Sequence, residues 1–171
     1  YRVYDYPDYV SAPNVAKSDD MLVIMSVCSI WREGTHFGWD FVSPYDELIP
    51  TMGFYDEGLP EASDWEIKYM VEHGIDAFQP CWYAGTNSAD NPMKIARNNQ
   101  YAIHDGYFNA KYSDLMSFSL MFENSGYISD VQREDFVNYV FPFWMDWYFS
   151  DPRYCRIEED GKEYIFLTIY Q

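Results

Sequence analysis

The sequence predicts a parallel α/β fold that corresponds to the first half of a barrel of alternating strands and helices. Four short apolar runs carry this prediction, each bordered by a helical or loop-rich stretch: residues 22–28, 76–83, 117–123 and 164–170. Runs that are apolar on both faces are typical of strands in a buried parallel sheet. Because the chain ends where the fourth run ends, we expect about the first four strand–helix units of such a barrel.

The first part of the chain leads into the sheet. Residues 1–20 are polar and rich in tyrosine, so we expect an extended lead-in rather than a domain. The first strand should cover about 21–29. The loop that follows, residues 30–60, is long for a compact fold, and loops of this length are usually functional or disordered. Its many aromatic side chains argue against disorder.

Three helices should connect the strands. The first is expected at about 61–73, because Gly74 is a natural residue to follow a helix end. A second helix should run from about 92 to 104, and the longest from about 130 to 149. Pro142 lies inside the third helix and should kink or split it.

A hairpin should precede the fourth strand. Asp160 and Gly161 stand between two short apolar runs, 154–157 and 164–166. An Asp-Gly pair in this context is typical of a two-residue hairpin turn. No linker between two domains is apparent, so residues 21–171 should form one unit.

Composition and charge exclude several classes of function. The chain carries 28 acidic and 11 basic residues, a formal net charge of −17. With no basic stripe, it should repel nucleic acid and anionic membranes. No run of 18 apolar residues is present, so we expect no membrane span. The compartment stays open, with an extracytoplasmic location, secreted or periplasmic, as the working expectation.

No cofactor or metal site is expected. The sequence has no P-loop, GxGxxG or HExxH motif. Its three cysteines, Cys28, Cys81 and Cys155, are far apart and lack the spacing of a zinc site. Cys28 and Cys81 lie within apolar runs, which favours buried free thiols over a disulfide.

Polar and aromatic side chains stand at the ends of the predicted strands, where parallel α/β folds bind ligands. These residues are Trp82, Tyr83, Glu123, Asn124 and Tyr170. Aromatics make up 20% of the chain, and aromatic rings can pack against the apolar faces of sugars or simply fill the core. Trp82 and Tyr83 therefore either contact sugar or pack under the loop after them. Asn124 either binds a sugar hydroxyl or caps a turn.

Glu123 is the best acidic candidate in the chain. It either binds substrate, acts as a catalytic acid or base, or is a structural, ion-paired carboxylate. The long loop after the first strand adds Trp31, His36, Trp39 and Asp40. We expect this loop to lie over the same face and to line the cleft.

Four segments in order resemble the glycoside hydrolase family 99-like proteins, including the WbsX-like group. The first is Gly53-Phe54-Tyr55-Asp56, and the second is Glu72-His73-Gly74-Ile75-Asp76-Ala77-Phe78 followed by Trp82-Tyr83. The third is Phe118-Ser119-Leu120-Met121-Phe122-Glu123-Asn124. The last comprises Asp151-Pro152-Arg153-Tyr154, Asp160-Gly161-Lys162 and the final run to Tyr170. The order and spacing agree over residues 21–171.

The resemblance implies a (β/α)8 TIM-type barrel and a glycoside hydrolase-like protein that acts on a polysaccharide or a glycoprotein glycan. The family's catalytic glutamates belong to a motif near the end of the barrel that is absent from this chain, so neither can be assigned here. At Gly38-Trp39-Asp40 the sequence departs from the family pattern, which puts the substrate contact of Asp40 in doubt.

Two other functions remain open at this point. The missing catalytic motif and the abundant aromatics also suit a non-catalytic carbohydrate-binding protein. Some relatives of the family are associated with glycan assembly, so a transferase-associated role is a third reading. In each case, the rest of the barrel or another chain should be needed to cover the core, because a half barrel leaves two sheet edges open.

Overall fold

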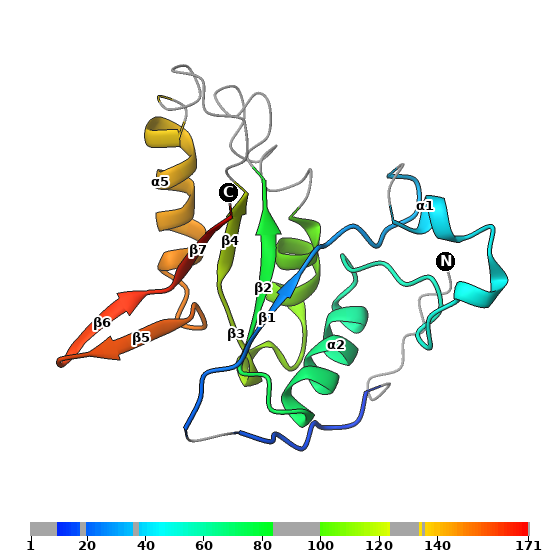
Figure 1. Cartoon of the computed structure of the whole chain (residues 1–171), viewed down its shortest axis with the longest axis horizontal. Helices are drawn as coiled ribbons and strands as arrows, with labels where there is room; N and C mark the ends of the chain where they lie inside the picture. Colours follow the sequence, from blue (N-terminus) through cyan, green and yellow to red (C-terminus); the bar gives the residue numbers. More distant parts are fainter. Residues whose placement is uncertain are drawn as a thin grey trace.

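A computed structural model describes residues 10–17, 20–35, 38–83, 100–123, 134 and 136–170. It is a mixed α/β structure built on a mostly parallel sheet (Figure 1). The strands of this sheet are β1 (Ile24–Val27), β2 (Ala77–Trp82), β3 (Ser117–Phe118), β4 (Leu120–Glu123) and β7 (Leu167–Tyr170).

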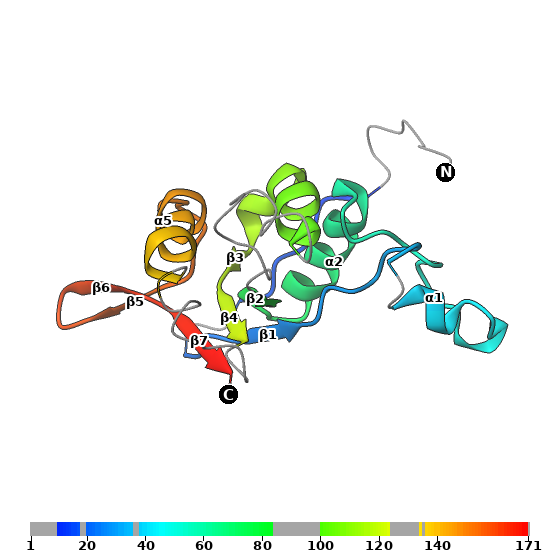
Figure 2. The ribbon, with the colours of Figure 1, turned by 90° about the horizontal axis from the view of Figure 1, so that it is seen from above.

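The strands lie side by side in the order in which they occur in the chain. β1 pairs with β2, β2 with β4, and β4 with β7, and every pair is parallel. β3 pairs with β2 beside the start of β4. Figure 2 shows the helices α2 and α5 on one face of this sheet. A parallel sheet whose strands follow the order of the chain, with its helices on one face, is the arrangement found in the wall of a barrel.

The third apolar run was predicted as one strand but forms two. Ser119 separates β3 from β4, opposite the part of β2 that contains Pro80. A proline has no N–H to donate to a neighbouring strand, which explains why the pairing is interrupted here. The Ser119 N–H still donates to the Phe78 carbonyl at 3.0 Å, so the two short strands remain aligned.

Helix α2 (Pro60–Glu72) confirms the first predicted helix within one residue. Its end is fixed by Gly74, whose φ of 77° is a left-handed conformation that costs glycine little. The Ile75 N–H donates to the Met70 carbonyl and the Gly74 N–H to the Val71 carbonyl, at 3.0 and 3.5 Å. This pattern is a Schellman motif, and it turns the chain directly into β2.

Shorter helical segments complete the described chain. They are α1 (Trp39–Val42), η1 (Asp46–Leu48), η2 (Ala102–Gly106), η3 (Tyr107–Asn109) and η4 (Ser113–Leu115). The predicted helix at 92–104 falls mostly outside the described residues, and its last residues belong to the π-helical turn η2. At Gly106, a Cβ atom would lie 2.3 Å from the Glu57 carbonyl oxygen, so only glycine allows this close approach.

The longest predicted helix is described from Phe136 onward as three consecutive segments. These are η5 (Phe136–Val140), α5 (Phe141–Trp144) and η6 (Met145–Phe149). The outer two are π-helical and the middle one is α-helical. Pro142 is the second residue of the α-helical turn, and the missing proline N–H, together with its ring, disfavours an uninterrupted α-helix. The expected disturbance at Pro142 thus takes the form of π-turns.

The predicted hairpin precedes β7, but it takes the first residues of the fourth apolar run, so residues 164–165 belong to the hairpin and 167–170 to the sheet. Tyr154 and Cys155 run beside Phe118, whose carbonyl accepts from the Cys155 N–H at 2.7 Å. The chain then leaves the sheet as β5 (Arg156–Glu159) and returns as β6 (Lys162–Ile165) before β7 begins. Asp160 and Gly161 have φ angles of 52° and 71°, as a two-residue type I′ turn requires.

Aromatic rings fill the space between the sheet and its helices. The rings of Phe118 and Tyr107 lie 5.4 Å apart at their centroids, and Phe118 also contacts Tyr154 at 5.1 Å. Trp82 and Trp144 meet edge to face at 5.0 Å. Many of the aromatic rings in the described part of the chain therefore pack in the core. The sequence had left core packing and sugar binding as the two alternatives for them.

The sheet ends in two strands, β1 and β7, that pair on one side only within the described residues. Apolar side chains at both are exposed, among them Met25 at 41% and Ile169 at 60%. Across these same residues, we find no helix with the length and hydropathy needed to cross a bilayer.

Replacing Gly74 with alanine should destabilise the protein by about 1 kcal/mol, because an L-residue is strained at this φ. Urea unfolding of the protein measures the loss. Gly74→Asn is the matched control, since asparagine tolerates the left-handed region better and should cost less. Equal stability of wild type and Gly74→Ala would contradict the proposed role of the helix end.

Candidate functional site

The face of the sheet opposite the helices, here called the inner face, carries a row of polar side chains. Phe78 and Trp82 belong to the hydrophobic core, so the alternation along β2 places Gln79 on the inner face. The Gln79 amide nitrogen donates to the hydroxyls of Ser119 at 2.9 Å and Thr168 at 3.0 Å. Its amide oxygen accepts from the Ser26 hydroxyl at 3.3 Å. One side chain thus links β1, the junction of β3 and β4, and β7.

Above this row, the C-terminal ends of three strands bring Tyr83, Glu123 and Tyr170 together. Glu123 pairs in register with Tyr170. Trp82 pairs with Phe122, so the next residue on each strand places Tyr83 beside Glu123. In Figure 1, β2 and β4 point toward the same edge of the sheet. We call Tyr83, Glu123 and Tyr170 the strand-end row.

Tyr83 is held in place by two thiols. Its hydroxyl hydrogen-bonds with the side chains of Cys28 and Cys81. Burial, followed by the influence of these two thiols, raises the pKa of the Tyr83 hydroxyl to about 12. Tyr83 therefore keeps its proton at neutral pH. Tyr170 is more open, with 56% of its surface exposed.

The structure corrects the expectation that Trp82 lines the site. Trp82 is fully buried, and its indole N–H donates to the Tyr148 hydroxyl at 3.2 Å. It lies on the helix side of the sheet, because the side chains of β2 alternate between the two faces. The same tyrosine holds His104, which is half-buried, with its Nε2 2.7 Å from the Tyr148 hydroxyl. Burial lowers the pKa of His104 to about 4.

The loop after β1 does not cover the strand-end row as expected. Its residues Trp31 and Trp39 pack on each other with centroids 4.3 Å apart, and Trp39 is almost fully buried. The Asp40 carboxylate accepts from the Gly34 N–H at 2.8 Å and so fixes a turn of the loop. Figures 1 and 2 both place α1, which contains Trp39 and Asp40, far from β4 and β7. The predicted residues His36 and Asn124 lie outside the described part.

The two ends of this loop are joined by charged groups that the sequence analysis missed. Arg32 donates from Nε to both carboxylate oxygens of Asp56, at 2.8 and 2.9 Å. The Trp31 N–H donates to the Glu57 carboxylate at 2.9 Å. The Arg32 guanidinium also lies 4.2 Å from the ring centre of Tyr101. We call Arg32, Asp56 and Glu57 the loop clamp.

Glu57 is the most perturbed carboxyl group of the clamp. It is 1% exposed. Burial raises the pKa of Glu57 to about 8, and the nearby Glu66 carboxylate adds to the effect. Burial likewise raises the pKa of Glu66 to about 7, although the Tyr55 hydroxyl bonds to it. Two carboxyl groups with raised pKa values are a known feature of active sites.

The surroundings of Glu57 nevertheless exclude a substrate. The cavity beside Glu57 and Glu66 measures about 10 Å³, which is room for about one water molecule. It lies between α2 and the helix side of the sheet. We therefore infer that Glu57 and Glu66 help to hold the loop in place and do not bind a substrate. The sequence gives no local signal that Glu57 is buried, because Asp56-Glu57 has the appearance of an ordinary solvated acidic pair.

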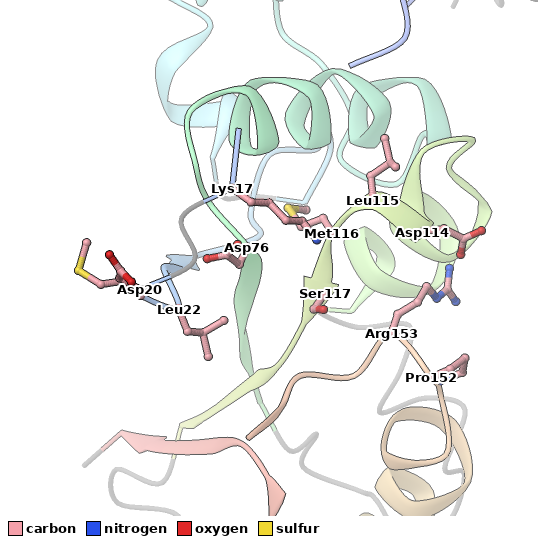
Figure 3. A pocket seen from close by; sticks show the side chains of 11 residues that line it. Lys17, Asp20, Leu22, Asp76, Asp114, Leu115, Met116, Ser117, Pro152 and Arg153 are labelled. Atoms are coloured by element: carbon pink, nitrogen blue, oxygen red, sulfur yellow. The ribbon is translucent and has the colours of Figure 1, made fainter. Parts of the chain in front are cut away.

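A hollow lies at the opposite end of the sheet from the strand-end row. Its volume is about 580 Å³, and Asp76 and Ser117, which precede β2 and begin β3, lie at its centre (Figure 3). Arg153 borders it and is held by Asp151 through paired hydrogen bonds at 2.7 and 3.0 Å. Ligands of parallel α/β folds bind at the carboxyl ends of strands, so we do not assign the site to this hollow.

No group of three or more His, Cys, Asp or Glu side chains in the described ranges could hold a metal ion. The comparisons with known proteins add no further constraint. No protein-family model, curated protein or solved structure matches the chain significantly. The resemblance to the family 99-like glycoside hydrolases therefore stays a prediction.

Replacing Gln79 with leucine should destabilise the protein by about 1 to 3 kcal/mol, because the fully buried Ser119 hydroxyl loses its partner. Chemical denaturation measures the loss. Thr168→Val removes one bond of the same row at a more open position and should cost less. A stable Gln79→Leu protein would show that the polar row contributes nothing to the sheet.

The stability of the protein should fall as the pH rises from 6.5 to 8. In this window an unfolded Glu57 is ionised, whereas the folded protein keeps it protonated until its pKa of about 8. The folded state then holds the extra proton, which lowers the free energy of unfolding by about 1 kcal/mol per pH unit. Folded His104 is neutral in this range, but an unfolded histidine still binds some proton near pH 6.5, so His104 partly offsets the fall there and contributes little by pH 8.

Thermal unfolding across this range tests the assignment. Glu57→Gln should make the dependence on pH shallower, because the amide does not ionise and only Glu66, with its raised pKa of about 7, then adds to the fall in this range. Glu158→Gln removes an exposed carboxylate of β5 and should leave the dependence as in the wild type. Identical slopes in wild type and Glu57→Gln would refute the assignment.

Proposed function

We propose that this chain is part of a glycoside hydrolase-like (β/α)8 barrel and that its inner face forms one wall of a carbohydrate-binding cleft. The strand-end row carries the proposal, because a carboxylate stands between two tyrosines at the carboxyl edge of a parallel sheet. Tyrosine rings pack against the C–H faces of sugars and also offer a hydroxyl. A carboxylate accepts hydrogen bonds from sugar hydroxyls. The resemblance found in the sequence supports the same substrate class.

The arrangement of the sheet supports the barrel. Four parallel strands in chain order, with helices on one face, need further strands on both sides to close. The exposed apolar side chains of β1 and β7 are consistent with that requirement. In this proposal the rest of the barrel, from the same or another chain, pairs with both edges. It also covers the polar row around Gln79.

The proposed role of Glu123 is to bind substrate. Hydrolysis by the common mechanisms needs two carboxyl groups on either side of the scissile bond. At the carboxyl ends of the described strands of the parallel sheet, Glu123 is the one carboxyl group we find. A second acid must then come from the remainder of the barrel. If none does, the same surface serves a non-catalytic carbohydrate-binding protein.

Screening the protein on an oligosaccharide array should identify a bound glycan, and calorimetry then measures its affinity. Tyr170→Ala should weaken binding several-fold to about tenfold, as the loss of an aromatic contact of about 1 kcal/mol implies. Glu123→Gln should weaken it as well, because the charged acceptor is lost. Release of reducing ends in the same samples separates hydrolysis from binding alone.

Two exposed residues of the hairpin provide matched controls. Tyr164→Ala and Glu158→Gln remove the same chemical groups away from the strand-end row and should leave affinity unchanged. The proposal fails if variants of the row and of the hairpin bind alike, or if no glycan binds.

A further inference from the structure

Cys28 and Cys81 are far apart in the sequence but adjacent in the sheet. The register of β1 and β2 pairs Val27 with Pro80, so the next residues on the two strands are these cysteines. One layer below them on the same face, the side chains of Ser26 and Gln79 touch at 3.3 Å. Neighbouring strands are about 4.8 Å apart, which is within the Cα separation of about 4.4 to 6.8 Å that a disulfide needs.

The two side chains are in contact as free thiols. Cys81 hydrogen-bonds with Cys28, and the Tyr83 hydroxyl bonds to both of them. Both cysteines are reduced in this structure. The register and these contacts place the two thiols side by side, with Tyr83 as their shared polar neighbour.

The surroundings give the two thiols different reactivity. Cys28 is exposed, whereas Cys81 is half-buried. Burial, and then the neighbouring Cys28 and Glu123, raise the pKa of the Cys81 thiol. An external reagent therefore meets Cys28 first, and Cys81 stands behind it. Cys155 is buried in another part of the sheet and serves as an internal reference.

We propose that Cys28 and Cys81 form a redox-active pair that closes to a cross-strand disulfide on the inner face. The oxidant is a low-molecular-weight disulfide. The Cys28 thiolate attacks one sulfur of that disulfide and releases a thiolate, which leaves a mixed disulfide on Cys28. The Cys81 thiolate then attacks the Cys28 sulfur and releases the second thiolate. The two cysteine protons pass to the released thiolates, so one disulfide is reduced as one is formed.

Closure changes the inner face beside the strand-end row. It joins β1 covalently to β2 at the carboxyl edge of the sheet. It also consumes both thiols that bond to the Tyr83 hydroxyl, so Tyr83 is free to take another partner. The inference concerns a modification site and does not depend on carbohydrate binding.

Equilibration with mixtures of reduced and oxidised glutathione, followed by alkylation and intact-mass measurement, tests the pair. The wild type should lose the mass of two hydrogen atoms, and peptide mapping should link Cys28 to Cys81. Cys155→Ser should behave as the wild type. Cys81→Ser should stop at a glutathione adduct on Cys28, because the second thiol is absent.

Two results would overturn the inference: a stable glutathione adduct on Cys28 of the wild type with Cys81 still alkylatable, or no reaction at Cys28 under oxidising conditions. A second measurement uses the unmutated protein, so its result does not depend on whether the variants fold. Phenylarsine oxide, which bridges two nearby thiols, should form an equimolar adduct that a monothiol does not remove. A failure to form this adduct would show that the thiols are not close in solution.

Discussion

The parallel pairing of β2 with β1 on one side and with β3 and β4 on the other is the constraint on which the structure depends. This pairing fixes the register, and the register decides which face each side chain of β2 occupies. Phe78 and Trp82 are directed to the helices, and Gln79 and Cys81 to the inner face. A shift by one residue would exchange the two sets, placing Trp82 on the inner face and Gln79 in the aromatic core.

Gln79 shows how the inner face is held together without a hydrophobic layer. Its amide makes three hydrogen bonds, to hydroxyls on β1, on β7 and at the junction of β3 and β4. A buried amide is costly unless it is paired, so this row specifies one register rather than only stabilising the sheet. The helix side is held by aromatic packing instead. The sheet therefore separates a dry face from a polar one, and the strand-end row stands at the rim of the polar face.

The long loop after β1 packs on itself beside α2. Its ends are joined by the loop clamp, and its interior packs around Trp39. This explains why so aromatic a loop lies beside α2 rather than over the strand ends. The raised pKa values of Glu57 and Glu66 result from that packing, and their cavity admits no substrate. The carboxyl groups with raised pKa values, Glu57 and Glu66, thus lie away from the strand-end row, which is the candidate ligand site.

The sequence by itself determined the elements: the apolar runs predicted the strands, Gly74 the end of α2, and Asp160-Gly161 the hairpin turn. These are local properties, set by backbone preference and by the number of consecutive apolar residues. Tertiary structure decided which aromatic side chains are buried, because that depends on register and on the neighbouring strand. For this reason Trp82 and Tyr83, adjacent in the chain, differ in role. It also brought Cys28 beside Cys81, a contact that spacing along the chain could not predict.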